Sequence, residues 1–199
     1  VSPGNGGTKD FPNCFLLDIK PDDVEKIIFK CKENKIGLVV IGPEAPLAEG
    51  LADNLRQHDI IVFGPGKDGA QLEASKDWAK ELMNQAGIPT AKHWTIRNKN
   101  EALKIINKFK QPLVVKADGL AGGKGVTVPK TIQETIEAVE EIFQGKFGEA
   151  GETIILEEIL TGPEVSIFAL CDGKRMILLP PAQDHKRLKE GDKGPNTGG

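Results

Sequence analysis

Short apolar runs alternate with amphipathic stretches along the first third of the chain. The apolar runs cover residues 14–17, 38–41 and 60–63, and the stretches between them, residues 24–31 and 47–55, place apolar side chains at helical spacing. Strands rich in Val and Ile that alternate with helices are typical of a parallel, doubly wound sheet. We therefore expect residues 1–66 to form part of an α/β domain whose ligand loops follow the carboxyl ends of the strands.

A different pattern follows the turn signal at residues 64–66. One connecting helix is expected over residues 70–86, ended by Gly87 and Pro89. Beyond it the pattern predicts strands at 94–96, 113–116, 126–128 and 153–156, and helices over 99–108 and from about 131 to 143. Thr131 and Glu134 have the spacing of a capping box. Residues 164–170 and 176–179 are expected to pair around Asp172-Gly173, which makes this part of the chain α+β.

Charge and hydropathy narrow the classes of function. The 26 basic and 29 acidic residues give a net charge of -3 without a basic stripe, which disfavours nucleic acid and anionic lipid as partners. No apolar stretch approaches the ~20 residues that span a bilayer, and the first residues do not resemble a signal peptide, so a cytoplasmic protein is expected. The scattered Cys14, Cys31 and Cys171 are expected to be free thiols.

The strongest chemical signal is a glycine-rich loop after the predicted strand at 113–116. Its residues of interest are Lys116, Gly119, Gly122, Gly123, Lys124 and Gly125. Bare backbone N–H groups in such a loop can approach phosphate oxygens, and the lysines supply positive charge. The spacing fits neither a Walker A loop nor a dinucleotide fingerprint, which disfavours a P-loop kinase and a nicotinamide dehydrogenase. A flexible hairpin tip with solvated lysines is the alternative.

The order of motifs around this loop resembles the ATP-grasp superfamily. The matching segments are residues 71–76 (QLEASK), 114–126, 155–160 (ILEEIL) and 162–166 (GPEVS). The resemblance implies that ATP lies between two α+β subdomains under the glycine loop. The implied ATP-binding residues are Lys76 and Lys116 at the phosphates, Gly119, Gly122, Gly123, Lys124 and Gly125 in the loop, Glu157, Glu158 and Leu160 at an adenine hinge that uses backbone groups, and Glu164 at the ribose. Taken singly, each side chain is explained more simply as a solvated surface group.

Three further motifs are residues 1–8 (VSPGNGGT), residues 41–47 (IGPEAPL), and residues 183–187 (QDHKR) with 194–199 (GPNTGG). Together they resemble the glycinamide ribonucleotide synthetase family, and the resemblance covers essentially the whole chain. Glu44 follows a predicted buried strand and could accept from a sugar hydroxyl or an amine, whereas a helix-start carboxylate after a tight turn is the alternative. Residues 184–187 offer cations for a phosphate or carboxylate and an anion for an amine, and a solvated charge run is their alternative.

This resemblance implies roles for further residues. The implied substrate-binding residues are Gly4, Asn5, Pro43, Glu44, Asp184, His185, Lys186, Arg187, Asn196, Thr197 and Gly198. The implied catalytic residues are Lys116, Lys124, Asp184, Lys186 and Arg187. No metal ligand is assigned in this chain, because both ends are interpreted as truncations and the ligands of Mg²⁺ or Mn²⁺ are expected beyond residue 199. The expected domains are a partial Rossmann-like substrate domain at 1–66 and an ATP-grasp domain at 67–199, with a complete glycine-loop subdomain at about 90–160 and a truncated remainder.

The function that the resemblance implies is that of an ATP-dependent carbon–nitrogen ligase in de novo purine biosynthesis. Phosphoryl transfer from ATP would convert glycine to glycyl phosphate, and phosphoribosylamine would displace the phosphate to give glycinamide ribonucleotide, ADP and phosphate. The isolated chain is not expected to be active, and fusion to other purine-pathway domains is compatible with the resemblance. The alternatives are another ATP-grasp ligase, such as a biotin-carboxylase-like enzyme, a nucleotide-binding module without catalysis, and a purely structural α/β protein.

Overall fold

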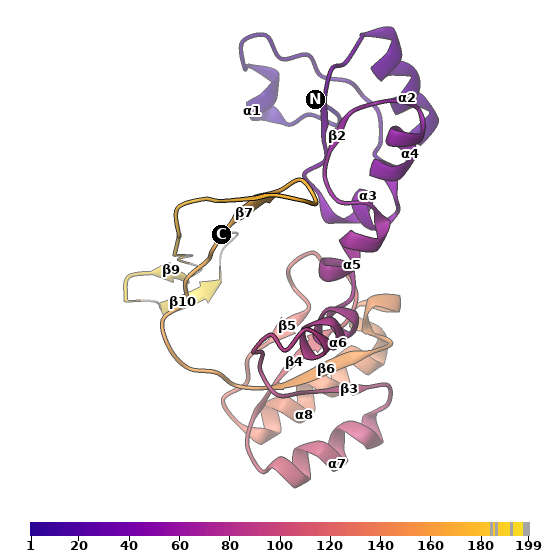
Figure 1. Cartoon of the computed structure of the whole chain (residues 1–199). Helices are drawn as coiled ribbons and strands as arrows, with labels where there is room; N and C mark the ends of the chain where they lie inside the picture. Colours follow the sequence, from indigo (N-terminus) through magenta and orange to yellow (C-terminus); the bar gives the residue numbers. More distant parts are fainter. Residues whose placement is uncertain (184, 186, 192, 197–199) are drawn as a thin grey trace. The chain divides into compact units, whose positions relative to one another are not determined.

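The computed structural model describes residues 1–183, 185, 187–191 and 193–196. The chain divides into two compact units, Val1–Ile159 and Leu160–Gly199. The first unit contains an N-terminal α/β part and a four-stranded sheet with its helices, and the second consists of β-strands and connecting segments (Figure 1). The predicted succession of α/β and α+β elements is therefore present.

The N-terminal part is built on a parallel pair of strands. These are β1 (Val39–Val40) and β2 (Val62–Phe63), with Val39 opposite Val62. The helices of this part are α1 (Gly6–Lys9), α2 (Val24–Glu33), α3 (Glu44–Ala48), α4 (Leu51–Gln57) and α5 (Lys67–Ala74). Its buried core comprises Ile41, Leu47, Leu51, Ala52, Leu55, Ile60 and Ala70. Parallel pairing and a core between the strands and the helices are what the alternating pattern predicts.

The predicted strand at residues 14–17 is wrong. The Val1 amino group donates to Phe15 O at 2.8 Å and the Val1 carbonyl accepts from Leu17 N at 2.9 Å, while Cys14 N donates to Phe11 O within a turn, and no strand of the described residues pairs with this segment. Phe15 is 82% exposed, so its side chain contributes little to a core. An apolar run becomes a stable strand only when neighbours cover its backbone and side chains, and local sequence does not supply those neighbours.

Two predicted helices are each divided into two. The expected helix at 47–55 is α3 followed by α4, because Gly50 between them has a left-handed backbone with φ 92°. The expected helix at 70–86 is α5 followed by α6 (Lys76–Gln85), because Ser75 adopts an extended conformation with φ -135° and ψ 115°. The Ser75 hydroxyl accepts from Trp78 N at 3.2 Å and so caps the new helix.

The second part of this unit is a four-stranded antiparallel sheet. Its strands are β3 (His93–Ile96), β4 (Leu113–Ala117), β5 (Val126–Thr127) and β6 (Ile154–Glu158), in the order β3–β6–β4–β5. The helices α7 (Lys99–Phe109) and α8 (Ile132–Glu141) cover one face of the sheet. The buried residues there are Ile96, Ala102, Ile106, Leu113, Val115, Ala138, Val139, Ile142, Ile154 and Leu156. Because side chains alternate along a strand, Val114 and Lys116 of β4 point to the other face.

The segment after α8 returns the chain to the sheet. Thr131 caps α8 as predicted, since its side chain accepts from Glu134 N at 3.1 Å, but Glu134 accepts from Lys130 N and not from Thr131 N. The chain then passes through a π-helical turn (Ile142–Lys146) and a 3₁₀ turn (Gly148–Gly151) into β6.

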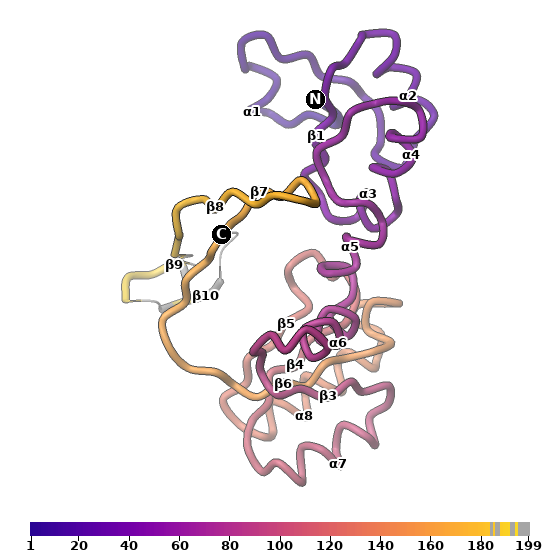
Figure 2. The backbone as a smooth tube through the Cα atoms, in the orientation of Figure 1, coloured from indigo at the N-terminus to yellow at the C-terminus, as the bar shows by residue number. Residues whose placement is uncertain are grey.

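The second unit contains two antiparallel strand pairs, visible as the segment from β7 to β10 in Figure 2. β7 (Ala169–Cys171) pairs with β8 (Met176–Leu178), and β9 (Arg187–Lys189) pairs with β10 (Lys193–Asn196). Asp172 Oδ1 accepts from Lys174 N at 2.8 Å and from Arg175 N at 2.6 Å, which fixes the predicted turn. The strands of the first pair are shorter than predicted, and an isolated bridge joins Ser166 to Ala182 beyond them.

Candidate functional site

A charged cluster lies on the face of the sheet opposite α7 and α8. Glu157 of β6 accepts from Lys116 of β4, with Lys116 Nζ 2.7 Å from Glu157 Oε2. Lys80 of α6 lies on the other side of the carboxylate, with its Nζ 3.0 Å from Glu157 Oε1. We call these three residues the Lys80–Glu157–Lys116 cluster. It is formed because α6 lies over the polar face of the sheet and contributes a lysine to it (Figure 1).

Burial and charge oppose each other at Glu157. The residue is 5% exposed, and desolvation alone would raise the pKa of its carboxyl. The hydrogen bond from Lys116 and the positive charges of Lys116 and Lys80 outweigh this effect, so the pKa of Glu157 lies below its ordinary value. The Lys80 contact is an ion pair without good hydrogen-bond geometry, because Oε1 has no hydrogen-bond partner among the described residues. The carboxylate is therefore held in its charged form by two cations.

Lys76 begins α6 and points to the start of the glycine loop. Its Nζ donates to Asp118 O at 3.1 Å and to Gly119 O at 3.2 Å. Desolvation lowers the pKa of the Lys76 ammonium, with the nearby charge of Asp118 acting in the opposite direction. The Asp118 carboxylate accepts from Asp77 N at 2.7 Å and from the Ser75 hydroxyl, so it caps the start of α6. The loop and the helix that carries Lys76 are thus tied together.

The glycine loop connects β4 to β5. Gly122 and Gly123 have φ values of 57° and 74°, in the left-handed region that glycine adopts without strain. Gly119 N donates to Ala150 O at 3.2 Å, and a Cβ at Gly119 would lie 2.9 Å from Ala150 Cα. Gly125 O accepts from Ala117 N at 2.8 Å and closes the loop. Lys124 is exposed, and its side chain makes no ion pair among the described residues.

The expected hinge residues fall at the junction of the two units. Glu158 ends β6, its amide donates to Lys92 O at 2.9 Å, and its carboxylate accepts from Lys92 N at 2.8 Å. Both the amide and the carboxylate of Glu158 are therefore bonded to the Lys92 backbone, next to the start of β3. Leu160 and Glu164 belong to the second unit, where both are exposed.

The expected substrate residues of the N-terminal part occupy turns and helix starts. Gly4 packs against Leu16, with which a Cβ would clash, and Asn5 caps α1 by accepting from Thr8 N at 2.9 Å. Pro43 is the N-cap of α3, and Glu44 lies exposed in the first turn of that helix. The helix dipole favours a carboxylate in this position. The position of Glu44 therefore agrees with its alternative interpretation, a carboxylate at the start of a helix.

The expected C-terminal substrate residues are only partly described. His185 is exposed, and Arg187 and Asn196 are placed on β9 and β10 by their backbones. Asp184, Lys186, Thr197 and Gly198 lie outside the described residues. The roles implied for this segment stay predictions.

Lys80 is a functional candidate that sequence reasoning missed. It is 7% exposed, although lysine is almost never buried without a partner. Its Nζ also donates to Thr90 Oγ1 at 2.7 Å. The sequence does contain one signal for Lys80. It lies four residues after Lys76, so both lysines fall on the same face of α6. The apolar Trp78 and Leu82 of the same helix are 41% and 37% exposed.

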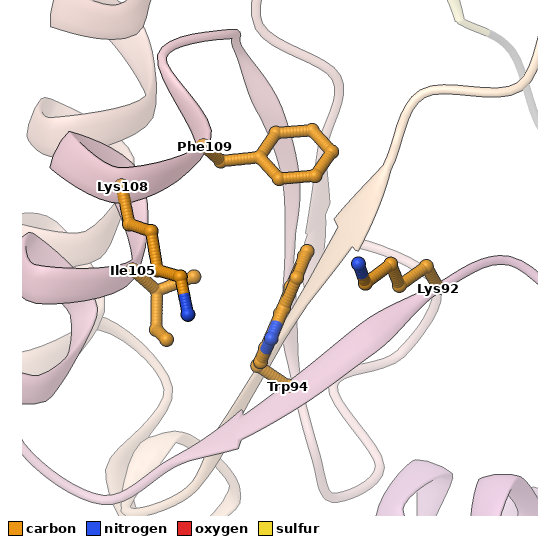
Figure 3. Close-up of a pocket in the computed structure, with 5 residues that line it drawn as sticks. All are labelled: Lys92, Trp94, Ile105, Lys108 and Phe109. Carbon is orange, nitrogen blue, oxygen red and sulfur yellow. The ribbon is translucent and has the colours of Figure 1, made fainter.

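A hollow lies on the α7 side of the sheet, and its lining includes no residue of the Lys80–Glu157–Lys116 cluster. Its volume is about 190 Å³, and it is lined by Lys92, Trp94, Ile105, Lys108 and Phe109 (Figure 3). The Trp94 and Phe109 rings meet edge to face with their centroids 5.2 Å apart, and both pack against the core under α7. None of the predicted site residues lines it.

Two features are absent from the described residues, a membrane-spanning helix and a group of metal-ligating side chains. None of their helices has the length and apolar character needed to cross a membrane. Within the same part of the chain, no three His, Cys, Asp or Glu side chains are grouped so that they could hold a metal ion.

Comparisons with known proteins agree along the whole chain. The N domain model of phosphoribosylglycinamide synthetase matches residues 1–73, and the model of its ATP-grasp (A) domain matches residues 74–199. The chain is 52% identical over 197 residues to a phosphoribosylamine–glycine ligase of Nostoc sp., covering 99% of this chain and 46% of that protein. It is also 52% identical over 201 residues to the trifunctional purine biosynthetic protein adenosine-3 of Homo sapiens, covering 100% of this chain and 20% of that protein.

A solved structure supports the same relationship. The crystal structure of phosphoribosylamine–glycine ligase from Thermotoga maritima matches with a TM-score of 0.78 and 34% identity, covering 98% of this chain and 46% of that one. The chain thus spans about half the length of this structure and of the ligase from Nostoc sp.. The predicted arrangement of an N-terminal α/β domain followed by an ATP-grasp domain is confirmed. The chain belongs to the phosphoribosylglycinamide synthetase family.

Proposed function

We propose that the protein containing this chain joins glycine to 5-phosphoribosylamine at the expense of ATP. The γ-phosphate of ATP passes to the glycine carboxylate, which gives glycyl phosphate and ADP. The amine of phosphoribosylamine then attacks the acyl carbon, the bond to phosphate breaks, and glycinamide ribonucleotide and phosphate are released. The names of the relatives at about half identity support this reaction.

The Lys80–Glu157–Lys116 cluster is the observation that carries the proposal. It places a partly exposed cation, Lys116, at the end of the strand that leads into the glycine loop, with its side chain 26% exposed. Phosphoryl transfer asks mainly for positioning and for neutralisation of negative charge. In the proposed site Lys116 and Lys76 offset charge on the phosphates, while backbone N–H groups of the loop approach the phosphate oxygens.

The loop also offers a means of protecting the acyl phosphate from water. Apart from their own chain neighbours, Gly122 and Gly123 have no atoms within 4 Å of the place where a Cβ would be, so packing does not oppose movement of this part of the loop over a ligand. Closure of such a loop excludes water from a reactive intermediate. We propose this role for residues 119–125, with Lys124 carried toward the phosphates by the same motion.

The remaining assignments are part of the same proposal. The adenine is held at residues 157–160 and the ribose by Glu164, and glycine and phosphoribosylamine are held by the residues implied from the N-terminal and C-terminal motifs. As part of the same proposal, the protein's ligands of Mg²⁺ or Mn²⁺ lie beyond residue 199 and act together with the nucleotide phosphates. We also propose a boundary at residue 66 between the two domains, a cytoplasmic location, and compatibility with fusion to other purine-pathway domains.

The test is ADP release by the full-length protein. Phosphoribosylamine is generated in the assay from ammonia and ribose 5-phosphate, and glycine is added or withheld. We expect ADP release only when both substrates are present. Release that is independent of glycine, or that needs a different acid, would assign the protein to another ATP-grasp ligase. ATP binding without any ADP release would identify a nucleotide-binding module that lacks catalytic activity.

A further inference from the structure

Lys80 is a buried lysine that the proposed reaction does not use. It lies one helical turn after Lys76 on the face of α6 that meets the sheet, and its side chain is 9% exposed. An ammonium group in such a place is stable only when a carboxylate and hydrogen-bond acceptors compensate its lost hydration. Glu157 and Thr90 supply these partners at 3.0 and 2.7 Å. The position of Lys80 is therefore bound to the charge on Glu157.

The two cations of the cluster differ in their access to solvent. The side chain of Lys116 is 26% exposed, whereas those of Lys80 and Glu157 are 9% and 6% exposed. Lys116 can therefore reach a ligand above the sheet, and Lys80 cannot. Since Thr90 also holds the Lys80 ammonium, Lys80 is the fixed partner of Glu157 and Lys116 is the exchangeable one.

This asymmetry matters when an anion arrives. If Lys116 turned toward a phosphate and Glu157 had no second partner, a charged carboxylate would be left alone in a buried site, which is strongly unfavourable. Lys80 removes this obstacle, because Glu157 stays paired after Lys116 has moved. In its absence, the attraction of the carboxylate for its remaining lysine would compete directly with the ligand.

We propose that Lys80 is a positioning residue for nucleotide binding: as the fixed counter-ion of Glu157, it releases Lys116 to the phosphates of ATP. The inference rests on the proposed function only for the identity of the ligand. It adds a residue to the site that acts through Glu157 and does not touch ATP.

A mutant cycle in the full-length protein tests this role. The dissociation constant of ATP is measured at equilibrium, together with kcat and KM for glycine-dependent ADP release. Lys80→Met is expected to raise the dissociation constant and the KM for ATP by about tenfold or more, with a smaller effect on kcat. The matched control is Lys99→Met, which removes the exposed 2.8 Å pair with Glu140 and should leave ATP binding unchanged.

The second arm of the cycle separates positioning from a purely structural role. With Glu157→Gln the neutral amide needs no counter-ion, so adding Lys80→Met to this variant should change ATP binding little. Equal weakening of ATP binding by Lys80→Met with Glu or Gln at position 157 would overturn the proposal, as would an unchanged dissociation constant in the single variant. If Lys80→Met does not fold, Lys80→Gln takes its place in both arms.

The outcomes for Lys80 and for the reaction are distinguishable. A wild-type protein that releases ADP with glycine but shows no coupling between positions 80 and 157 contradicts only the role of Lys80. A wild-type protein that binds ATP and shows the coupling, but has no ligase activity, contradicts only the proposed reaction.

Discussion

At the scale of single residues, the charges of the sheet face depend on one another. The sequence suggested Lys116 as a phosphate contact and Glu157 as part of an adenine hinge, two separate roles. The structure joins them in one ion pair at 2.7 Å and adds Lys80. The reason is that alternate residues of β4 and β6 point to the same face, where α6 contributes its own lysine. The effect of changing any of these residues must then be considered for the cluster as a whole.

The assigned role of Lys116 leads to a kinetic prediction. Lys116→Ala in the full-length protein should lower the turnover of glycine-dependent ADP release by about 10²–10³-fold, because a preorganised positive charge at the phosphates is lost. The control is Lys104→Ala, which removes an exposed lysine of α7. Turnover close to that of the wild type would rule out the phosphate role of Lys116.

Glu157 gives stability a predictable dependence on pH. Burial would raise its pKa, but Lys116 and Lys80 outweigh burial and lower it in the folded chain. A lowered pKa contributes stability that is fully present above the unfolded-state value of about 4.3 and is lost as pH falls through the lower folded-state value. The melting temperature of the wild type should therefore exceed that of Glu157→Gln at pH 7, and the difference should shrink below about pH 4.3.

The matched control for this measurement is Glu152→Gln, which changes an exposed glutamate near the same strand. Its melting temperature should follow that of the wild type across the same pH range. A difference between the wild type and Glu157→Gln that stays constant down to pH values where glutamate is protonated would contradict the assignment.

At the scale of elements, the glycine loop is held near both ends, at Gly119 and Gly125, and is open at its tip. Gly119 lies against the backbone of Ala150, whereas Gly122 and Gly123 have open space around them. The sequence predicted a loop rich in glycine but not which glycine is required for packing. At Gly119 that distinction arises because the 3₁₀ turn at residues 148–151, far along the chain, packs against the start of the loop.

Gly119→Ala should therefore destabilise the full-length protein. A Cβ at this position would come within 2.9 Å of a backbone atom that a rotamer change cannot move away. We expect a loss of about 1–3 kcal/mol, measured as a lower midpoint of chemical denaturation. Gly37→Ala is the control, since its Cβ would meet no atom within 4 Å. Equal midpoints for the two variants would show that the strand–turn contact is not tight.

At the scale of the whole molecule, charge and ligand preference are the properties open to test. The net charge of -3 favours small-molecule partners over nucleic acid, and the loop spacing disfavours a dinucleotide. ATP at about a hundred times its dissociation constant should stabilise the full-length protein by about 2.7 kcal/mol, whereas NAD⁺ at the same concentration should not. Thermal unfolding with each nucleotide measures this. Comparable stabilisation by NAD⁺ would contradict the assignment of the loop.

Much of the element order could be predicted because its signals are local. The period of apolar residues predicted α7, α8 and the strands of the four-stranded sheet, and the Thr131 cap and the Asp172 turn were read from side chains that bond their own backbone. Local signals did not predict the division at Ser75 or the loss of the strand at 14–17. The division at Ser75 depends on Asp118, which bonds to the Ser75 hydroxyl and to Asp77 N from a distant part of the chain, and residues 14–17 have no strand partner among the described residues.

The sequence by itself determined the family and the candidate residues, since motif order and spacing are properties of the chain alone. Only the tertiary structure decided which charges meet. Lys80 looks like a surface lysine in an amphipathic helix, yet it is buried, while Trp78 and Leu82 of the same helix are exposed. The physical reason is that a lysine can be buried only opposite a compensating carboxylate, and Glu157 reaches it from a strand that is distant in sequence.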